Sequence, residues 1–236
     1  MSSDQASRIV ERVRAVRERL IAAGTVLAHA DGVSRDLFPV AIGPEEGRAL
    51  RDWVGNEGAV RTLETGLGFA ISTLFIIEGL LANGRSGRHV ATDPYQFVGL
   101  PMHATTYVGV GLQILEEAGV RDLVEFYPEE SLIVLPRLLA EGREFDFAFL
   151  DGNHRFEGAF LDLIYSGRLL RRAGSSSSMT RNFQPCNVRS PSAPPTLGGR
   201  GKTKAKRAFT SGRCSGPVRT RCSYGRMRSS SASDGH

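Results

Sequence analysis

Residues 63–75, with the sequence LETGLGFAISTLF, decide the fold of this chain. A stretch that reads as a strand ends near Glu64, a Gly-x-Gly turn follows at Gly66 and Gly68, and a helix opens at about Ala70. Glycines in such a turn let the backbone approach a ligand closely, and the start of the helix offers unpaired N–H groups. A turn of this kind directly after a strand is typical of nucleotide-binding α/β folds.

Strand and helix patterns alternate on both sides of this turn. The periodicity of apolar residues predicts strands at 59–65, 88–93, 122–127 and 145–150, and helices at 6–23, 44–54, 70–82, 104–118, 131–141 and 157–172. Alternation with short loops predicts a parallel sheet covered on both faces. The expected fold class is therefore α/β, a Rossmann-like doubly wound parallel sheet preceded by N-terminal helices.

The composition changes abruptly at residue 174. Residues 174–236 hold 12 Lys or Arg against one acid, while the whole chain has a net charge of +5, so the preceding body is acidic. Thirteen serines and five prolines without helical or strand periodicity predict a disordered basic tail. The expected organisation is an N-terminal helical segment at 1–50, a partial cofactor-binding domain at 51–173 and the tail at 174–236.

The first twenty residues are polar and rich in charge, without the apolar core of a signal peptide. The longest apolar run, at 70–82, is interrupted by Ser, Thr and Glu and is too short to cross a bilayer. All three cysteines lie in the tail, at spacings that match no zinc or redox pattern. These features predict a cytoplasmic protein that does not bind membranes.

Acidic residues follow two more of the predicted strands. Asp93 ends the strand in the stretch HVATDPYQ, 25 positions after Gly68, where nucleotide-binding folds place a carboxylate for ribose hydroxyls. An Asp-Pro turn that caps the strand is the alternative. Glu130 and Ser131, in EFYPEESLIVLP, lie in a loop expected at the ligand-binding edge of the sheet, although Ser131 also suits a helix N-cap.

The fourth strand ends in FDFAFLDGNHRFEGAFLDL, residues 145–163. Asp151 closes the strand and His154 lies in the loop directly after it. An aspartate and a histidine at this edge can supply a metal ligand and a general base. The alternative is an exposed or purely structural histidine.

Residues 44–173 resemble the class I S-adenosylmethionine-dependent methyltransferases, and are most similar to the branch of small-molecule O-methyltransferases. The resemblance rests on ETGLG, HVATDPYQ, PEESLIVLP and FDFAFLDGNHRF, in that order. It implies that S-adenosylmethionine is the cofactor. By the same resemblance, Glu64, Gly66 and Gly68 would bind the methionine end of the cofactor, and Asp93 would bind its ribose. Glu130 and Ser131 would flank the adenine, and Asp151 would face the methyl donor and the substrate.

The implied activity is methyl transfer to an oxygen of a small molecule. Such an enzyme aligns acceptor, methyl group and sulfur and removes a proton from the acceptor. His154, or a divalent metal held by Asp151, would assist that proton loss. Two alternatives remain. One is an NAD-type Rossmann oxidoreductase, although the third glycine of that motif is missing here. The other is an inactive methyltransferase remnant whose KTKAKR run (202–207) binds nucleic acid.

The resemblance stops at about residue 173. Family members continue with a glycine turn and an apolar fifth strand that ends in an acidic pair, whereas this chain has SSSSMTRN at 175–182. We therefore expect an incomplete sheet of four strands, with 145–150 at its edge, and little activity. Codons for Met179 and Thr180 read as aspartate in a shifted frame, which indicates a frameshift at about 172–175.

Overall fold

The computed structural model describes residues 3–83, 87–97, 107–178 and 188–189. They belong to one unit, Met1–Pro194, and residues Pro195–His236 form a second unit outside the described residues. The helices are α1 (Ser3–Ala23), α2 (Pro44–Asn56), α3 (Ile71–Ala82), η1 (Pro94–Gln96), α4 (Val110–Glu117), η2 (Arg121–Leu123), α5 (Ser131–Ala140) and α6 (Phe156–Leu169). The strands are β1 (Thr25–Leu27), β2 (Ser34–Asp36), β3 (Arg61–Thr65), β4 (Arg88–Thr92), β5 (Val124–Tyr127), β6 (Phe145–Leu150), β7 (Leu170–Ser178) and β8 (Val188–Arg189).

The main sheet has the order β5-β4-β3-β6-β7-β8. Strands β3 to β7 pair in parallel, and β8 pairs antiparallel with β7. The chain moves outward from β3 to β4 and β5, and then returns to the other side of β3 with β6. Ligands bind where the strand order reverses in this way, at the carboxyl ends of the strands. The Rossmann-like α/β fold predicted from the sequence is confirmed.

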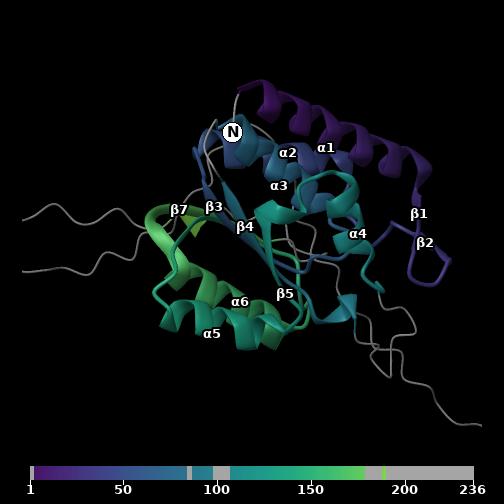
Figure 1. Ribbon diagram of the computed structural model, residues 1–236. Helices are drawn as coiled ribbons and strands as arrows, with labels where there is room; N and C mark the ends of the chain where they lie inside the picture. The colour runs from purple at the N-terminus through teal and green to yellow at the C-terminus, as the bar shows by residue number, and fades with distance from the viewer. Residues whose placement is uncertain (1–2, 84–86, 98–106, 179–187, 190–236) are drawn as a thin grey trace, which may run out of the picture. The chain divides into compact units, whose positions relative to one another are not determined.

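Helices cover both faces of this sheet (Figure 1). Alternate residues of β6 point to opposite faces, as the pleat of a strand requires. Phe147 and Phe149 pack into the larger cluster with α1, α2, α3 and α4, whereas Ala148 and Leu150 pack with α5 and α6. All six residues of β6 are buried, which explains why its sequence is almost wholly apolar.

A buried ion pair fastens α1 to α3. Glu78, on α3, is 1% exposed, and its carboxylate accepts hydrogen bonds from Arg17 and from Arg14 on α1. The Arg17 guanidinium also lies 3.9 Å from the ring centroid of Phe75. Burial opposes the charged form of Glu78, but the two arginines hold its pKa below the ordinary value. The N-terminal helix is therefore part of the folded unit.

The sheet continues beyond the four predicted strands, and the expectation that β6 forms its edge was wrong. Residues 175–178 of β7 pair with residues 147–150 of β6. The serine run has no hydrophobic periodicity and therefore predicts no strand, but ladder hydrogen bonds are made by backbone groups of any residue. The predicted disorder is thus contradicted at 174–178 and 188–189, and the other residues of 174–236 lie outside the described residues.

Smaller differences occur at element ends. Helix α6 ends at Leu169, three residues before the predicted end, because residues 170–172 already belong to β7. Helix α4 begins at Val110 rather than at 104, and residues 104–106 lie outside the described residues. The antiparallel hairpin of β1 and β2 was not predicted because its strands have three residues each. Among the described residues no helix combines the length and apolarity that crossing a membrane requires.

We expect Glu78→Gln to destabilise the fold by about 3 kcal/mol, because the substitution leaves the buried Arg17 charge without its counterion. Urea unfolding at pH 7 measures this difference. Since the folded-state pKa of Glu78 is lowered, its contribution is present above the ordinary value of 4.5 and is lost as the pH falls below it. The variant should therefore lose less stability than the unchanged protein on acidification.

Glu11→Gln is the matched control, because Glu11 lies on the exposed side of α1. It should change the free energy of unfolding by no more than about 0.5 kcal/mol. Equal stability of the Glu78 and Glu11 variants would contradict the anchoring role of Glu78.

Candidate functional site

The glycine turn after β3 lies between the ends of two neighbouring strands. The Gly66 N–H donates to the carbonyl oxygen of Thr92 at the end of β4, at 2.8 Å. On the other side, the N–H of Asp151 donates to the carbonyl of Thr65 at 3.0 Å. Gly66 has a φ of +87°, and a Cβ there would lie 2.3 Å from the carbonyl oxygen of Asp151. Only glycine fits this position, because any side chain would collide with the backbone after β6.

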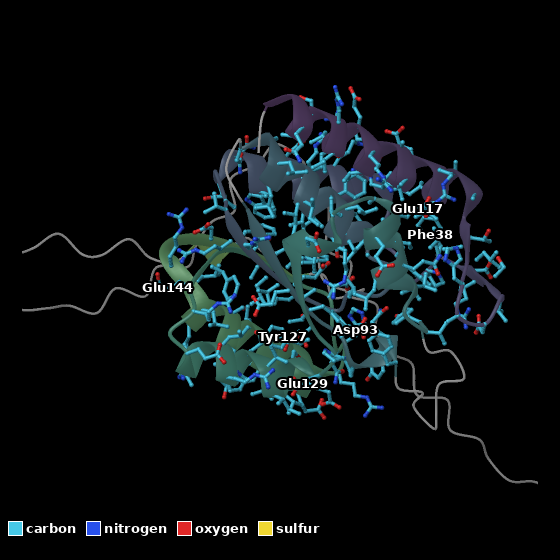
Figure 2. The ribbon with its side chains drawn as sticks, in the orientation of Figure 1. Phe38, Asp93, Glu117, Tyr127, Glu129 and Glu144 are labelled. Carbon is cyan, nitrogen blue, oxygen red and sulfur yellow. The ribbon has the colours of Figure 1, made fainter. Side chains whose placement is uncertain are left out.

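Asp93 fixes the turn from the neighbouring strand. Its carboxylate accepts from the backbone N–H of Gly68 at 2.8 Å and from that of Tyr95 at 2.7 Å, and from the side-chain amide of Gln96 at 3.2 Å. Burial raises the pKa of Asp93, and these hydrogen bonds oppose that rise. Figure 2 shows Asp93 at the same end of the sheet as Tyr127 and Glu129. The backbone N–H of Asp93 donates to the carbonyl oxygen of Tyr127 at 3.0 Å.

Glu64 lies beneath the turn and is completely buried. Its carboxylate accepts hydrogen bonds from the hydroxyls of Ser72 and Thr73 in the first turn of α3, and His89 on β4 lies 3.1 Å away. The carboxylate therefore holds the start of α3 against the sheet. Ser72 lines the cavity above, whereas Glu64 itself does not.

A cavity of about 220 Å³ opens over the carboxyl ends of the strands. Seven of the eight predicted site residues line it, from four different loops: Gly66, Gly68, Asp93, Glu130, Ser131, Asp151 and His154. The structure thus brings these residues together around one space, and it places only Glu64 behind the wall.

Asp151 and His154 face each other at this cavity. The Nε2 atom of His154 lies 3.6 Å from an Asp151 carboxylate oxygen, which is an ion-pair distance when the imidazole is protonated. The side chains of His154 and Asp151 are 43% and 19% exposed, respectively, so both remain accessible from the cavity. A histidine supported by a carboxylate in this way can accept a proton from a bound molecule.

The described residues around Asp151 do not form a metal site. Nowhere in the described ranges do three His, Cys, Asp or Glu side chains come together as a metal site would require. The suggested metal on Asp151 therefore lacks further ligands among these residues.

Several cavity residues carry no sequence motif. Val40 and Ile42 reach the cavity from the loop before α2, and Tyr107 from the loop before α4. The Tyr107 ring packs edge-on against Phe69, with ring centroids 5.1 Å apart. Apolar residues in loops look alike in a sequence, so only the folded chain shows that these form one wall. Tyr95 was detectable, since it follows Asp93 and Pro94 in the same motif.

The strand order and the helices on both faces of the sheet define the class of this protein: a Rossmann-like α/β domain. Residues 63–175 match the family model described as "Methyltransferase domain". This match spans just under half of the chain, and over that part the sequence is similar to the class I S-adenosylmethionine-dependent methyltransferases.

Individual relatives match only in part. Tricin synthase 2 from Oryza sativa subsp. japonica is 34% identical over 135 residues, which cover 56% of this chain and 41% of the rice protein. The cofactor-bound crystal structure of Rv0187 from MTB superposes with a TM-score of 0.50 and 26% identity, over 70% of this chain and 64% of that protein. An O-methyltransferase from Bacillus cereus in complex with SAH gives a TM-score of 0.49 and 23% identity, over 71% and 65%. The chain spans less than two thirds of the length of each.

We expect Gly66→Ala to destabilise the protein by about 3 kcal/mol, from the positive φ and from the collision with the Asp151 carbonyl. Gly58→Ala is the matched control, because Gly58 has a φ of +58° but a Cβ there would meet no other atom within 4 Å. It should cost about 1 kcal/mol from backbone strain alone. Thermal unfolding of both variants measures the difference, and equal losses would contradict the close approach at Gly66.

Proposed function

We propose that this protein transfers a methyl group from S-adenosylmethionine to an oxygen atom of a small molecule. The observation that carries the proposal is the single cavity that joins the glycine turn, Asp93 and the Asp151–His154 pair in a methyltransferase domain. The family match favours methyl transfer over the NAD-type oxidoreductase. A cytoplasmic location stays a prediction.

The charge of the cavity supports this cofactor. Asp93, Glu130 and Asp151 line it, and within the described residues neither Lys nor Arg does. Such a lining favours a ligand with positive charge, and S-adenosylmethionine carries a sulfonium and an ammonium group. When bound, the cofactor supplies a methyl group that is already activated for transfer.

The chain's residues then bind, orient and remove a proton. Gly66 and Gly68 leave room for the ligand beside the backbone, and the Asp93 carboxylate, fixed by its N–H donors, accepts from the ribose hydroxyls. Glu130 and Ser131 flank the adenine. His154 takes the proton from the acceptor hydroxyl, and Asp151 stabilises the imidazolium that forms.

The acceptor belongs to the same proposal. Val40, Ile42 and Tyr107 give the cavity an apolar wall beside His154. This wall suits a small organic molecule with an uncharged body and a hydroxyl group near His154. The rice relative is named for its product, tricin, which agrees with a small-molecule acceptor.

Isothermal titration with S-adenosylhomocysteine (SAH) and with NAD tests the cofactor. We expect SAH to bind and NAD not to bind. Asp93→Ala should weaken SAH binding by about tenfold to a hundredfold, because hydrogen bonds to a charged group are lost. Asp52→Ala, which removes an exposed carboxylate of α2 outside the cavity, should bind SAH unchanged. Tighter binding of NAD than of SAH would overturn the proposal.

We also propose that a frameshift at about residues 172–175 explains why the sequence stops resembling the methyltransferase family after residue 173. The family match ends at residue 175, next to the point where the composition changes. The serines of β7 then occupy the place of an apolar strand, and we propose that the chain as written binds its cofactor weakly and turns over little. A nucleic-acid-binding role of the basic tail would instead require that natural selection has kept its sequence, which a frameshift product does not provide.

Resequencing the gene around codon 174 tests the frameshift. We expect a second frame that reads V-V-V-D-D over the codons for 175–180, and a restored chain with higher thermal stability because apolar side chains in β7 would be buried. An intact frame without such a reading would refute the frameshift and favour a selected tail.

A further inference from the structure

Asp162 is a buried carboxylate that the proposed reaction does not use. It lies on the inward-facing side of α6 together with Ser166 and Leu169, and it is 2% exposed. The spacing of these residues is that of one helix face, where packing against a sheet calls for apolar side chains. A carboxylate at this position needs an explanation, because burying one without full pairing is unfavourable.

The contacts of Asp162 lead to the cavity. Its Oδ2 atom accepts a hydrogen bond from the Thr65 hydroxyl at 3.0 Å. Burial raises the pKa of Asp162, and the hydroxyls of Ser131 and Thr65 oppose that rise by favouring the charged form. Thr65 and Ser131 both line the cavity, from the ends of β3 and of the loop after β5. Asp162 therefore supports the Thr65 wall of the cavity from behind.

Glycine at position 152 makes this arrangement possible. A Cβ there would lie 3.1 Å from the Thr65 hydroxyl oxygen and 3.4 Å from Oδ2 of Asp162. Gly152 itself lines the cavity in the loop after β6. The Thr65 hydroxyl and the Asp162 carboxylate thus meet beside Gly152, where a side chain would crowd both of them.

The second oxygen of Asp162 argues against a purely stabilising role. Oδ1 is buried and lacks a hydrogen-bond partner among the described residues. Buried polar atoms are nearly always paired, and an unpaired one destabilises the fold. An apolar residue would serve the packing of α6 better, so stability alone does not account for this carboxylate.

We propose that Asp162 is a positioning residue of the cofactor site, which holds the hydroxyl group of Thr65 in the orientation that binds the adenosine part of the ligand. This inference rests on the proposed function, since it assigns a role within the same cavity. The Thr65 hydroxyl donates its proton to Asp162, so only its lone pairs remain to accept from a ligand or a bound water. Asp162 acts through this hydroxyl and does not touch the ligand.

The test is isothermal titration of the full chain with SAH. Asp162→Leu should weaken binding about tenfold, because the Thr65 hydroxyl loses its acceptor. Asp162→Asn keeps an oxygen that can accept from Thr65, and it should stay within about threefold of the unchanged protein. Glu157→Leu, which removes an exposed carboxylate from the first turn of the same helix, is the matched control and should bind SAH unchanged.

Thr65→Val tests the same hydrogen bond from the other residue and leaves the sequence of α6 unchanged. It should weaken SAH binding, and the double variant with Asp162→Leu should bind no more weakly than Asp162→Leu alone, because the two residues act as one unit. Thermal unfolding shows whether each variant is folded. If Asp162→Leu is not folded, the Thr65→Val result decides.

Four outcomes would overturn the inference. They are unchanged binding by Asp162→Leu, unchanged binding by Thr65→Val, equal losses for Asp162→Leu and Asp162→Asn, and losses that multiply in the double variant. The unchanged protein separates this inference from the proposed function. If it binds no SAH, both fail, whereas SAH binding with any of these four outcomes defeats only the role of Asp162.

Discussion

The carboxylate of Asp93 joins the ends of β3 and β4, and the cavity depends on that join. It accepts from the Gly68 N–H in the glycine turn and from the Tyr95 N–H in η1. Gln96 extends the connection, since its amide also binds the Gly68 carbonyl and its oxygen accepts from the N–H of Gly111. A buried carboxylate must keep its donors, so separating these loops would be strongly unfavourable.

Buried carboxylates surround the cavity, and they reduce the stability of the fold around it. Burial raises the pKa of Asp93 and of Asp162, so the folded protein holds a proton on each more tightly than the unfolded chain does. Each ionised group therefore reduces stability as the pH rises through its folded-state pKa. Glu64 is buried as well, but Ser72, Thr73 and His89 surround it with partners. Functional sites commonly hold such groups, because stability is given up there for binding.

Strand β7, on the other side of β6 from β3, is held by backbone pairing rather than by apolar side chains. Residues 175–178 form a strand beside β6 although all four are serine. The neighbouring strand presents a row of backbone groups that require partners, and any extended segment can supply them. Arg171 strengthens the start of this strand, with its guanidinium 2.6 Å from the buried carboxylate of Asp146 on β6. The backbone of β6 thus calls for an adjacent strand, and the side-chain pattern of residues 175–178 does not predict that strand.

The sequence by itself determined the α/β class, the parallel direction of the strands and seven residues of the cavity, because strand ends followed by Gly, Asp or His are local patterns. Tertiary structure alone decided which loops meet. It placed Glu64 behind the wall, added Val40, Ile42 and Tyr107 to the site, and connected Asp162 to Thr65 across 97 residues. Contacts between distant residues depend on how helices pack on the sheet, and no local pattern encodes that packing.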